Sequence, residues 1–180
     1  MLQDVERILF DEDVLAKRVR ELGEEISKDY AGEEVMLVGI LKGASVFMSD
    51  LIRQITIPAY IDYMVVSSYG NSAETSGVVR IIKDLEDNIE GKNIIIVEDI
   101  IDTGLTLDYL KQNLLSRKPK SLKICTLLDK PARRVKEITI DYKGYEVPDE
   151  FIIGYGIDYA EKYRNLPFIG TLKREVYEKN

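Results

Sequence analysis

The sequence predicts an α/β fold in which a mostly parallel central sheet is flanked by helices. Short, continuous apolar runs alternate along the chain with apolar residues at helical spacing. Continuous rather than alternating apolar strands are typical of a parallel sheet that helices cover on both faces. The length of 180 residues lies within the usual range for one domain, and no repeat or Pro-, Gly- or Ser-rich linker divides it. We therefore expect a single domain over residues 1–180.

In the first half of the chain, an amphipathic helix is the clearest predicted element. Asp11 can cap its first turn, the next two acidic residues suit a helix N-terminus, and Gly32 ends the pattern. Residues 68–77 are polar, contain glycine and exceed the length of a tight hairpin turn, which predicts a mobile loop. The predicted elements are a helix at residues 11–31, a strand at 34–41, a helix through Val46, Phe47, Leu51 and Ile55, and strands at 59–67 and 77–83.

In the second half, the most strongly apolar strand pattern lies at residues 92–98. The single cysteine, Cys125, lies within another apolar run and is expected to be a buried, inert thiol. The predicted elements here are strands at 92–98, 121–128 and 151–154, and a helix at 105–115.

The charge balance and the missing residue types exclude several functions. A net charge of -7 works against broad attraction to nucleic acid or anionic lipid, so any bound phosphate has to be held locally. The chain contains no histidine, which excludes Ser-His-Asp and Cys-His catalysis and most zinc sites. Because no signal-peptide pattern or membrane-spanning run appears, we expect a cytoplasmic protein with no nucleic acid or membrane partner.

The most informative segment is residues 94–106, IIIVEDIIDTGLT, at the end of the central strand pattern. Ligands of open α/β sheets collect beyond the carboxyl ends of the strands. Glu98 and Asp99 could hold hydroxyl groups or a magnesium ion there. The turn at 103–106 can direct backbone N–H groups and hydroxyls toward an anion at a helix N-terminus. On spacing alone, a plainer interpretation has similar weight: Asp102 and Thr103 merely cap the helix, and Glu98 and Asp99 are solvated acids at the strand end.

Residues 97–106 resemble the signature that binds phosphoribosyl pyrophosphate (PRPP) in type I phosphoribosyltransferases, in the form found in hypoxanthine-guanine phosphoribosyltransferases. Haloacid-dehalogenase-like phosphatases, response-regulator receivers and P-loop nucleotidases need other arrangements of acids, lysine or glycine. Four further segments resemble the same family in the same order. They are residues 41–44, like its pyrophosphate loop; 68–70, like its lid; 128–130, like its purine-recognition strand end; and 147–159, like its base-stacking segment.

This resemblance implies a type I phosphoribosyltransferase fold with a small hood and a mobile lid loop. It also implies a Mg²⁺-dependent enzyme of purine salvage. Such an enzyme transfers the phosphoribosyl group of PRPP to N9 of hypoxanthine or guanine, and the products are IMP or GMP and pyrophosphate. The habit of the family further implies a homodimer or a homotetramer.

For PRPP, the resemblance implies that Glu98 and Asp99 hold the ribose hydroxyls and magnesium, with Asp158 as a further metal ligand. Asp102 is implied to be the general base that accepts or orients the proton at N7 of the purine. At Leu105 some relatives carry lysine, so only a backbone contribution is expected there. The implied PRPP-binding residues are Glu98, Asp99, Asp102, Thr103, Gly104, Leu105 and Thr106.

For pyrophosphate, the resemblance implies that Lys42 and Gly43 bind through backbone amides, in a loop that the family often holds in a cis peptide. Arg164 is implied to clamp the same group with its guanidinium. Ser68 and Tyr69 are implied to belong to the lid, which excludes water. Without the resemblance, Lys42 and Arg164 would be interpreted as solvated surface charges.

For the purine, the resemblance implies that Lys130 donates a hydrogen bond to O6, which disfavours adenine because adenine presents an amino group there. Phe151 is implied to stack on the ring, and Ile152 and Asp158 to meet its N1–N2 edge through backbone groups. Without the resemblance, Phe151 and Ile152 would be interpreted as core residues.

Two other functions stay open on the sequence. The first is an enzyme of the same fold that uses xanthine, adenine or uracil. The second is a non-catalytic regulator on the same scaffold that senses PRPP and binds nucleic acid, although this acidic chain offers no basic face for such binding.

Overall fold

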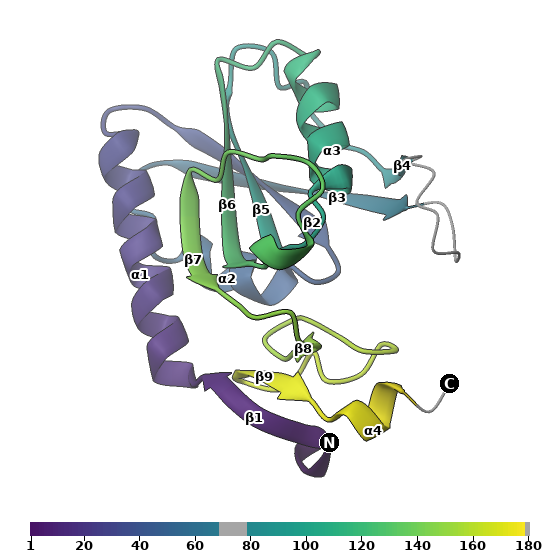
Figure 1. Cartoon of the computed structure of the whole chain (residues 1–180). Helices are drawn as coiled ribbons and strands as arrows, with labels where there is room; N and C mark the ends of the chain where they lie inside the picture. Colours follow the sequence, from purple (N-terminus) through teal and green to yellow (C-terminus); the bar gives the residue numbers. More distant parts are fainter. Residues whose placement is uncertain (69–78, 179–180) are drawn as a thin grey trace.

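Residues 1–68 and 79–178, which the structure describes, form a large six-stranded sheet and a small three-stranded one (Figure 1). The structure is a computed structural model. The large sheet has the order β4-β3-β2-β5-β6-β7, with β3 and β4 antiparallel and every other pair parallel. Its strands are β2 (Val35–Leu41), β3 (Ala59–Ser68), β4 (Val79–Lys83), β5 (Asn93–Ile101), β6 (Ser121–Asp129) and β7 (Tyr142–Glu146). The mostly parallel sheet expected from the sequence is confirmed.

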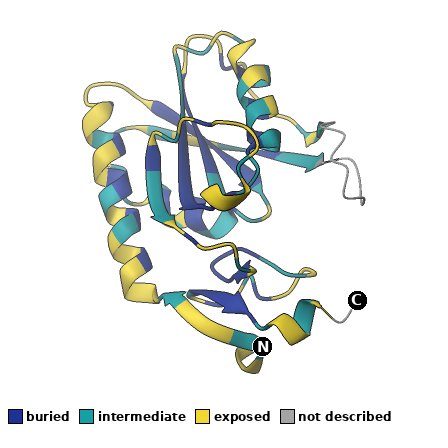
Figure 2. Cartoon of the chain, in the orientation of Figure 1, coloured by how far each residue is buried: buried dark blue, intermediate teal, exposed yellow. Residues whose placement is uncertain are grey.

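Helices cover both faces of the large sheet. The side chains of β5 alternate between the faces: Ile95 and Val97 join the core under α1 and α2, whereas Ile94 and Ile96 join the core under α3. Figure 2 shows buried strands between helices whose outer faces are exposed. The helices are α1 (Glu12–Asp29), α2 (Ser45–Ile52) and α3 (Leu105–Leu115).

The small sheet forms the hood that the resemblance implies. Its order is β1-β9-β8, with both pairs antiparallel, and it joins the two ends of the chain (Figure 1). The loop after β8 meets the loop after β2, since a Cβ atom on Gly156 would lie 2.4 Å from the carbonyl oxygen of Gly43. The hood therefore reaches the carboxyl ends of the parallel strands. Its strands are β1 (Val5–Phe10), β8 (Ile152–Ile153) and β9 (Ile169–Leu172), and short helices lie at Leu2–Asp4, Pro131–Arg133 and Arg174–Tyr177 (α4).

Most predicted elements are confirmed, with three corrections. The central strand β5 continues to Ile101, three residues beyond its predicted end at Glu98, so Asp99 also lies within the strand. Ile55 lies beyond the end of α2, which stops at Ile52. Strands β1, β7 and β9 were not predicted, because their short sequences lack a continuous apolar run.

Three further features concern the first helix cap, the cysteine and membrane-spanning helices. Asp11 caps α1 as expected, with its carboxylate accepting a hydrogen bond from the Val14 amide at 2.9 Å. Cys125 is fully buried, and burial raises the pKa of its thiol, which fits an inert residue. Within the described ranges, no helix is long and apolar enough to cross a membrane.

Candidate active site

The carboxyl end of β5 carries two neighbouring acids, Glu98 and Asp99, which face opposite sides of the strand. The side chain of Asp99 lies against the loop after β2: a Cβ atom on Gly43 would lie 1.7 Å from its Oδ2 atom. Only glycine fits there without a shift of the acid, so the end of β5 and the loop after β2 are in direct contact. The Leu41–Lys42 peptide in the same loop is cis, as the resemblance implies.

The chain from Asp102 to Thr106 forms a small hollow at the start of α3. Gly104 is the N-cap of this helix, in the left-handed region at φ 81°. The Leu105 amide donates to Oγ1 of Thr103 at 3.4 Å, whereas the Asp102 side chain accepts no hydrogen bond from the first turn among the described residues. The interpretation of Asp102 as a helix cap is therefore wrong. The hollow has a volume of about 140 Å³, and its size, its helix N-terminus and its nearby hydroxyls suit a phosphate group. It is lined by Glu98, Ile100, Ile101, Asp102, Thr103, Gly104, Thr106 and Leu107.

Asp102 lines this hollow, and Lys130 lies next to its wall, because the Lys130 amide donates to the carbonyl oxygen of Ile101 at 2.9 Å. The Oδ1 atom of Asp102 is buried, and no hydrogen-bond partner for it exists among the described residues. Lys130 is 7% exposed and donates from Nζ to the carbonyl oxygen of Glu150 at 2.8 Å. Burial lowers the pKa of Lys130, and the charge of Asp102 opposes this effect. A buried carboxylate oxygen without a partner is costly, which indicates a ligand that would satisfy it.

The side chains of Lys42 and Arg164, which are implied to bind pyrophosphate, lie close to each other. The Nζ atom of Lys42 lies 3.0 Å from Glu161, and its side chain is exposed. The guanidinium of Arg164 donates to the Gly156 carbonyl at 2.8 Å and pairs with Asp158 at 3.0 Å and with Glu161 at 3.4 Å. The two cations are thus brought together, and Glu161 contacts both of them.

The residues implied to contact the purine differ in exposure. Phe151 is 37% exposed, so its interpretation as a core residue is wrong, whereas Ile152 is buried at 4%. The ring of Phe151 lies edge-on to that of Tyr159 at 5.1 Å and tilted against that of Tyr177 at 5.0 Å. This leaves an aromatic surface beside Lys130 that could accept a flat ring. Of the two lid residues, Ser68 ends β3 and Tyr69 lies outside the described residues.

The three carboxylates implied to bind metal are only partly assembled. Glu98 and Asp99 are neighbours, but Asp158 is held by Arg164 and by the Glu161 amide at 2.8 Å. In the part of the chain that the structure describes, no three His, Cys, Asp or Glu side chains converge as a metal site. Either acid at the end of β5 still fits Mg²⁺, which commonly takes one or two carboxylates and completes its shell with water and substrate phosphates.

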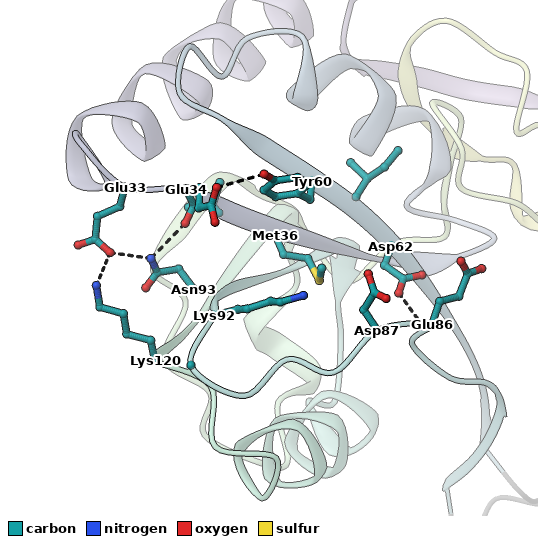
Figure 3. Close-up of a pocket in the computed structure, with 13 residues that line it drawn as sticks. Glu33, Glu34, Met36, Tyr60, Asp62, Glu86, Asp87, Lys92, Asn93 and Lys120 are labelled. Carbon is teal, nitrogen blue, oxygen red and sulfur yellow. Dashed lines mark hydrogen bonds and ion pairs between the residues drawn. The ribbon is translucent and has the colours of Figure 1, made fainter.

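A larger cavity, of about 600 Å³, lies elsewhere in the molecule (Figure 3). It is at the amino ends of β2 and β5, where Asn93 donates to Glu33 and Lys120 pairs with the same carboxylate at 2.6 Å. Ligands of parallel sheets bind at the carboxyl ends instead, so volume alone does not identify the active site.

The comparisons with known proteins agree with this geometry. The phosphoribosyl transferase domain family matches residues 8–160. A hypoxanthine-guanine phosphoribosyltransferase of Bacillus subtilis (strain 168) is 53% identical over 178 residues, which is 99% of both chains. The chain belongs to the hypoxanthine-guanine phosphoribosyltransferase family. A crystal structure of a hypoxanthine phosphoribosyltransferase from Staphylococcus aureus has a TM-score of 0.96 and 51% identity, covering 98% of this chain and 96% of that one. A crystal structure of a hypoxanthine-guanine phosphoribosyltransferase from Bacillus anthracis has a TM-score of 0.90 and 53% identity, covering 94% of this chain and 99% of that one.

In this hypoxanthine-guanine phosphoribosyltransferase family member, the acidic pair carries an electrostatic cost. Burial, and then the charge of Asp99, raises the pKa of Glu98 well above its usual range. Burial also raises the pKa of Asp99 to about 6, against the opposing effect of its backbone hydrogen bonds. A bound cation would offset this cost.

The raised pKa of Asp99 predicts how its replacement changes stability with pH. Above pH 6 the buried charge lowers the free energy of unfolding, so Asp99→Asn is expected to stabilise the metal-free protein by about 1–3 kcal/mol. As the pH falls through the range between 6 and 3.8, the folded state binds more protons than the unfolded state and the gain disappears. Urea unfolding of both proteins in EDTA at pH 7.5 and pH 4 measures this. A variant that is less stable at pH 7.5 would contradict it.

The position of Glu161 leads to a second prediction, which concerns the affinity for pyrophosphate. Its carboxylate pairs with Lys42 and Arg164, so an incoming pyrophosphate has to displace it. Glu161→Gln is expected to tighten pyrophosphate binding in Mg²⁺ by about two- to fivefold, since exposed ion pairs are weak. Calorimetry measures this, with Glu175→Gln as a control that removes the same charge from the exposed surface of α4. Unchanged or weaker binding in Glu161→Gln would exclude the competition.

Sequence reasoning missed several residues of this site. In the sequence, Glu161 is only one more acid in a charged segment. Its role could not be recognised there, because it depends on a contact with Lys42, which is distant in the chain. Tyr159 lay inside the recognised base-stacking segment but was given no part. Tyr177, near the C-terminus, reaches Phe151 only through the fold of the hood.

Proposed function

We propose that this chain transfers the phosphoribosyl group of PRPP to N9 of hypoxanthine or guanine, giving IMP or GMP and pyrophosphate. Its single most direct support is the phosphate-sized hollow at residues 102–106, which lies beside the unpaired carboxylate oxygen of Asp102 and the buried Lys130. The family membership supports the same reaction. Residues 1–180 act as one domain in this proposal, and the cell compartment is the cytoplasm.

The reaction divides among three parts of the site. The hollow at 103–106 holds the 5′-phosphate, and Lys130 and Phe151 hold and stack the 6-oxopurine, whose N1–N2 edge faces backbone groups at Ile152 and Asp158. As N9 attacks the anomeric carbon and the bond to pyrophosphate breaks, Asp102 accepts or orients the proton at N7. Its buried Oδ1 atom is then paired.

The departing pyrophosphate carries the growing negative charge. Arg164, Lys42 and the amides of the 42–44 loop stabilise it, because they are fixed donors near the carboxyl ends of β2 and β5. Glu98 and Asp99 hold the ribose hydroxyls and Mg²⁺. When bound, Mg²⁺ would neutralise phosphate charge and help to orient the pyrophosphate. Ser68 and Tyr69 close the site against water, and the active form is a homodimer or a homotetramer.

Product formation by the purified chain with PRPP and Mg²⁺ tests the proposal. Hypoxanthine, guanine, xanthine, adenine and uracil are offered separately, with and without EDTA. IMP and GMP formation that is lost in EDTA is expected. Nucleotide from xanthine, adenine or uracil alone would assign another base, and no product despite tight PRPP binding would favour a regulator.

Lys130 predicts the base preference. Lys130→Met is expected to lower kcat/KM for hypoxanthine by about 10- to 100-fold, because O6 loses its charged donor. The relative use of adenine should rise, since no cation then faces its amino group. Steady-state rates with both bases measure this. Lys17→Met serves as control, because that lysine lies on the exposed face of α1. An unchanged hypoxanthine rate in Lys130→Met would remove Lys130 from the purine site.

A further inference from the structure

We propose that Arg134 and Asp129 are positioning residues that aim the amides of the phosphate hollow. Arg134 lies outside the segments assigned above to substrate binding, and Asp129 lies in the 128–130 segment but was given no role of its own there. This inference rests on the proposed function, because it takes the hollow at residues 102–106 to be the site of the 5′-phosphate.

The two residues form a largely buried ion pair behind the hollow. The side chain of Arg134 is 11% exposed and that of Asp129 is 7% exposed, and the Nη2 atom of Arg134 donates to Oδ1 of Asp129. Asp129 is fixed because it ends β6, where it pairs in register with Ile101 of β5. Its other oxygen lies 3.5 Å from Lys143. A buried pair of this kind holds its geometry because breaking it would leave an uncompensated charge.

The guanidinium of Arg134 also bonds to the loop that forms the hollow. Its Nε atom donates to the carbonyl oxygen of Asp102 at 3.0 Å. The next two amides continue the pattern, because Val135 and Lys136 both donate to the carbonyl oxygen of Thr103, at 2.9 and 3.0 Å. Two consecutive carbonyls are therefore held from one side by residues 134–136.

Because peptide groups are planar, fixing these two carbonyls also fixes the direction of the amides that follow them. In a trans peptide the C=O of one residue and the N–H of the next point in opposite directions. Holding the carbonyls of Asp102 and Thr103 toward the 134–136 segment turns the amides of Thr103 and Gly104 away from it. Neither amide donates a hydrogen bond to another described residue. These two donors are therefore available to an anion in the hollow.

The fit of Gly104 supports the same close packing. A Cβ atom there would lie 2.7 Å from the Lys136 carbonyl oxygen and 3.2 Å from Cδ of Arg134. The loop and the 134–136 segment thus touch along their backbones. Donors that are fixed before the ligand arrives bind it without a cost of reorganisation.

Binding of two different ligands separates positioning from general stability. IMP occupies the hollow through its 5′-phosphate, whereas pyrophosphate with Mg²⁺ occupies the separate loop at 42–44. Arg134→Met is expected to raise the Kd of IMP about tenfold and to leave the Kd of pyrophosphate unchanged, as measured by calorimetry. The matched control is Arg133→Met, because Arg133 is 57% exposed and pairs with Asp149 at the surface. It is expected to change neither Kd.

Arg134→Lys tests whether the charge alone is sufficient. Lysine restores a cation beside Asp129 but cannot make two bonds in different directions, so IMP binding is expected to stay weakened. If Arg134→Met does not fold, the Kd values of IMP and of pyrophosphate are compared in Arg134→Lys and Asp129→Asn instead.

Three results would overturn the inference. They are unchanged IMP binding in Arg134→Met, equal weakening of both ligands, and full rescue by lysine. If the wild-type chain forms IMP while one of these results is obtained, only the positioning role fails. A wild-type chain that neither binds nor forms IMP would overturn the proposed function as well.

Discussion

Gly43→Ala is expected to lower kcat/KM for IMP formation by about 100-fold or more, because misplacing a catalytic group by about 1 Å can cost that much. The added Cβ atom would lie 1.7 Å from Oδ2 of Asp99, so the carboxylate or the loop has to move. Both partners of this contact belong to the proposed site for PRPP and magnesium. The change should also weaken the binding of pyrophosphate in Mg²⁺, measured by calorimetry on the same preparation.

Gly91→Ala is the matched control for this glycine. Gly91 has a positive φ of 72° and no atoms within 4 Å of an added Cβ, so alanine there is strained but meets no neighbour. It is expected to lower the free energy of unfolding by about 1 kcal/mol and to leave the rate unchanged. A Gly43→Ala enzyme with wild-type kcat/KM would show that the close contact with Asp99 is not needed for the reaction.

Asp102→Asn is expected to lower kcat by about 10²- to 10⁴-fold, because an amide cannot accept the proton at N7 of the purine. The buried Oδ1 atom has no partner among the described residues, so the substitution breaks no hydrogen bond of that atom. The KM for PRPP is therefore expected to change much less than kcat. Initial rates of IMP formation at saturating PRPP measure the effect.

Asp108→Asn is the control for Asp102→Asn. Asp108 lies in the first turn of α3, where it makes only a long ion pair with Lys136 at 3.9 Å. It is expected to retain kcat. If Asp102→Asn also retains kcat, another group takes the N7 proton, and the unpaired oxygen of Asp102 has a different role.

The fold class could be predicted from the sequence because buried parallel strands are continuous apolar runs. The alternation along β5 places Ile95 in one core and Ile96 in the other, so a strand of this kind has no polar face. The hood strands could not be predicted in the same way. β1 is largely exposed. β9 becomes a strand only by pairing with β8 and with β1, which lies more than 150 residues earlier in the chain.

By itself, the sequence determined the succession of the three main helices and of β2, β3, β4, β5, β6 and β8, the acidic segment at the end of β5 and, through five ordered motifs, the family. These features are local, because they depend on residue types at short spacings. Only the tertiary structure decided that Asp102 has a buried oxygen without a partner and is not a helix cap. It alone placed Gly43 against Asp99 and Arg134 behind the phosphate hollow. These contacts join segments separated by more than 30 residues, and their distances depend on how the whole sheet and hood pack.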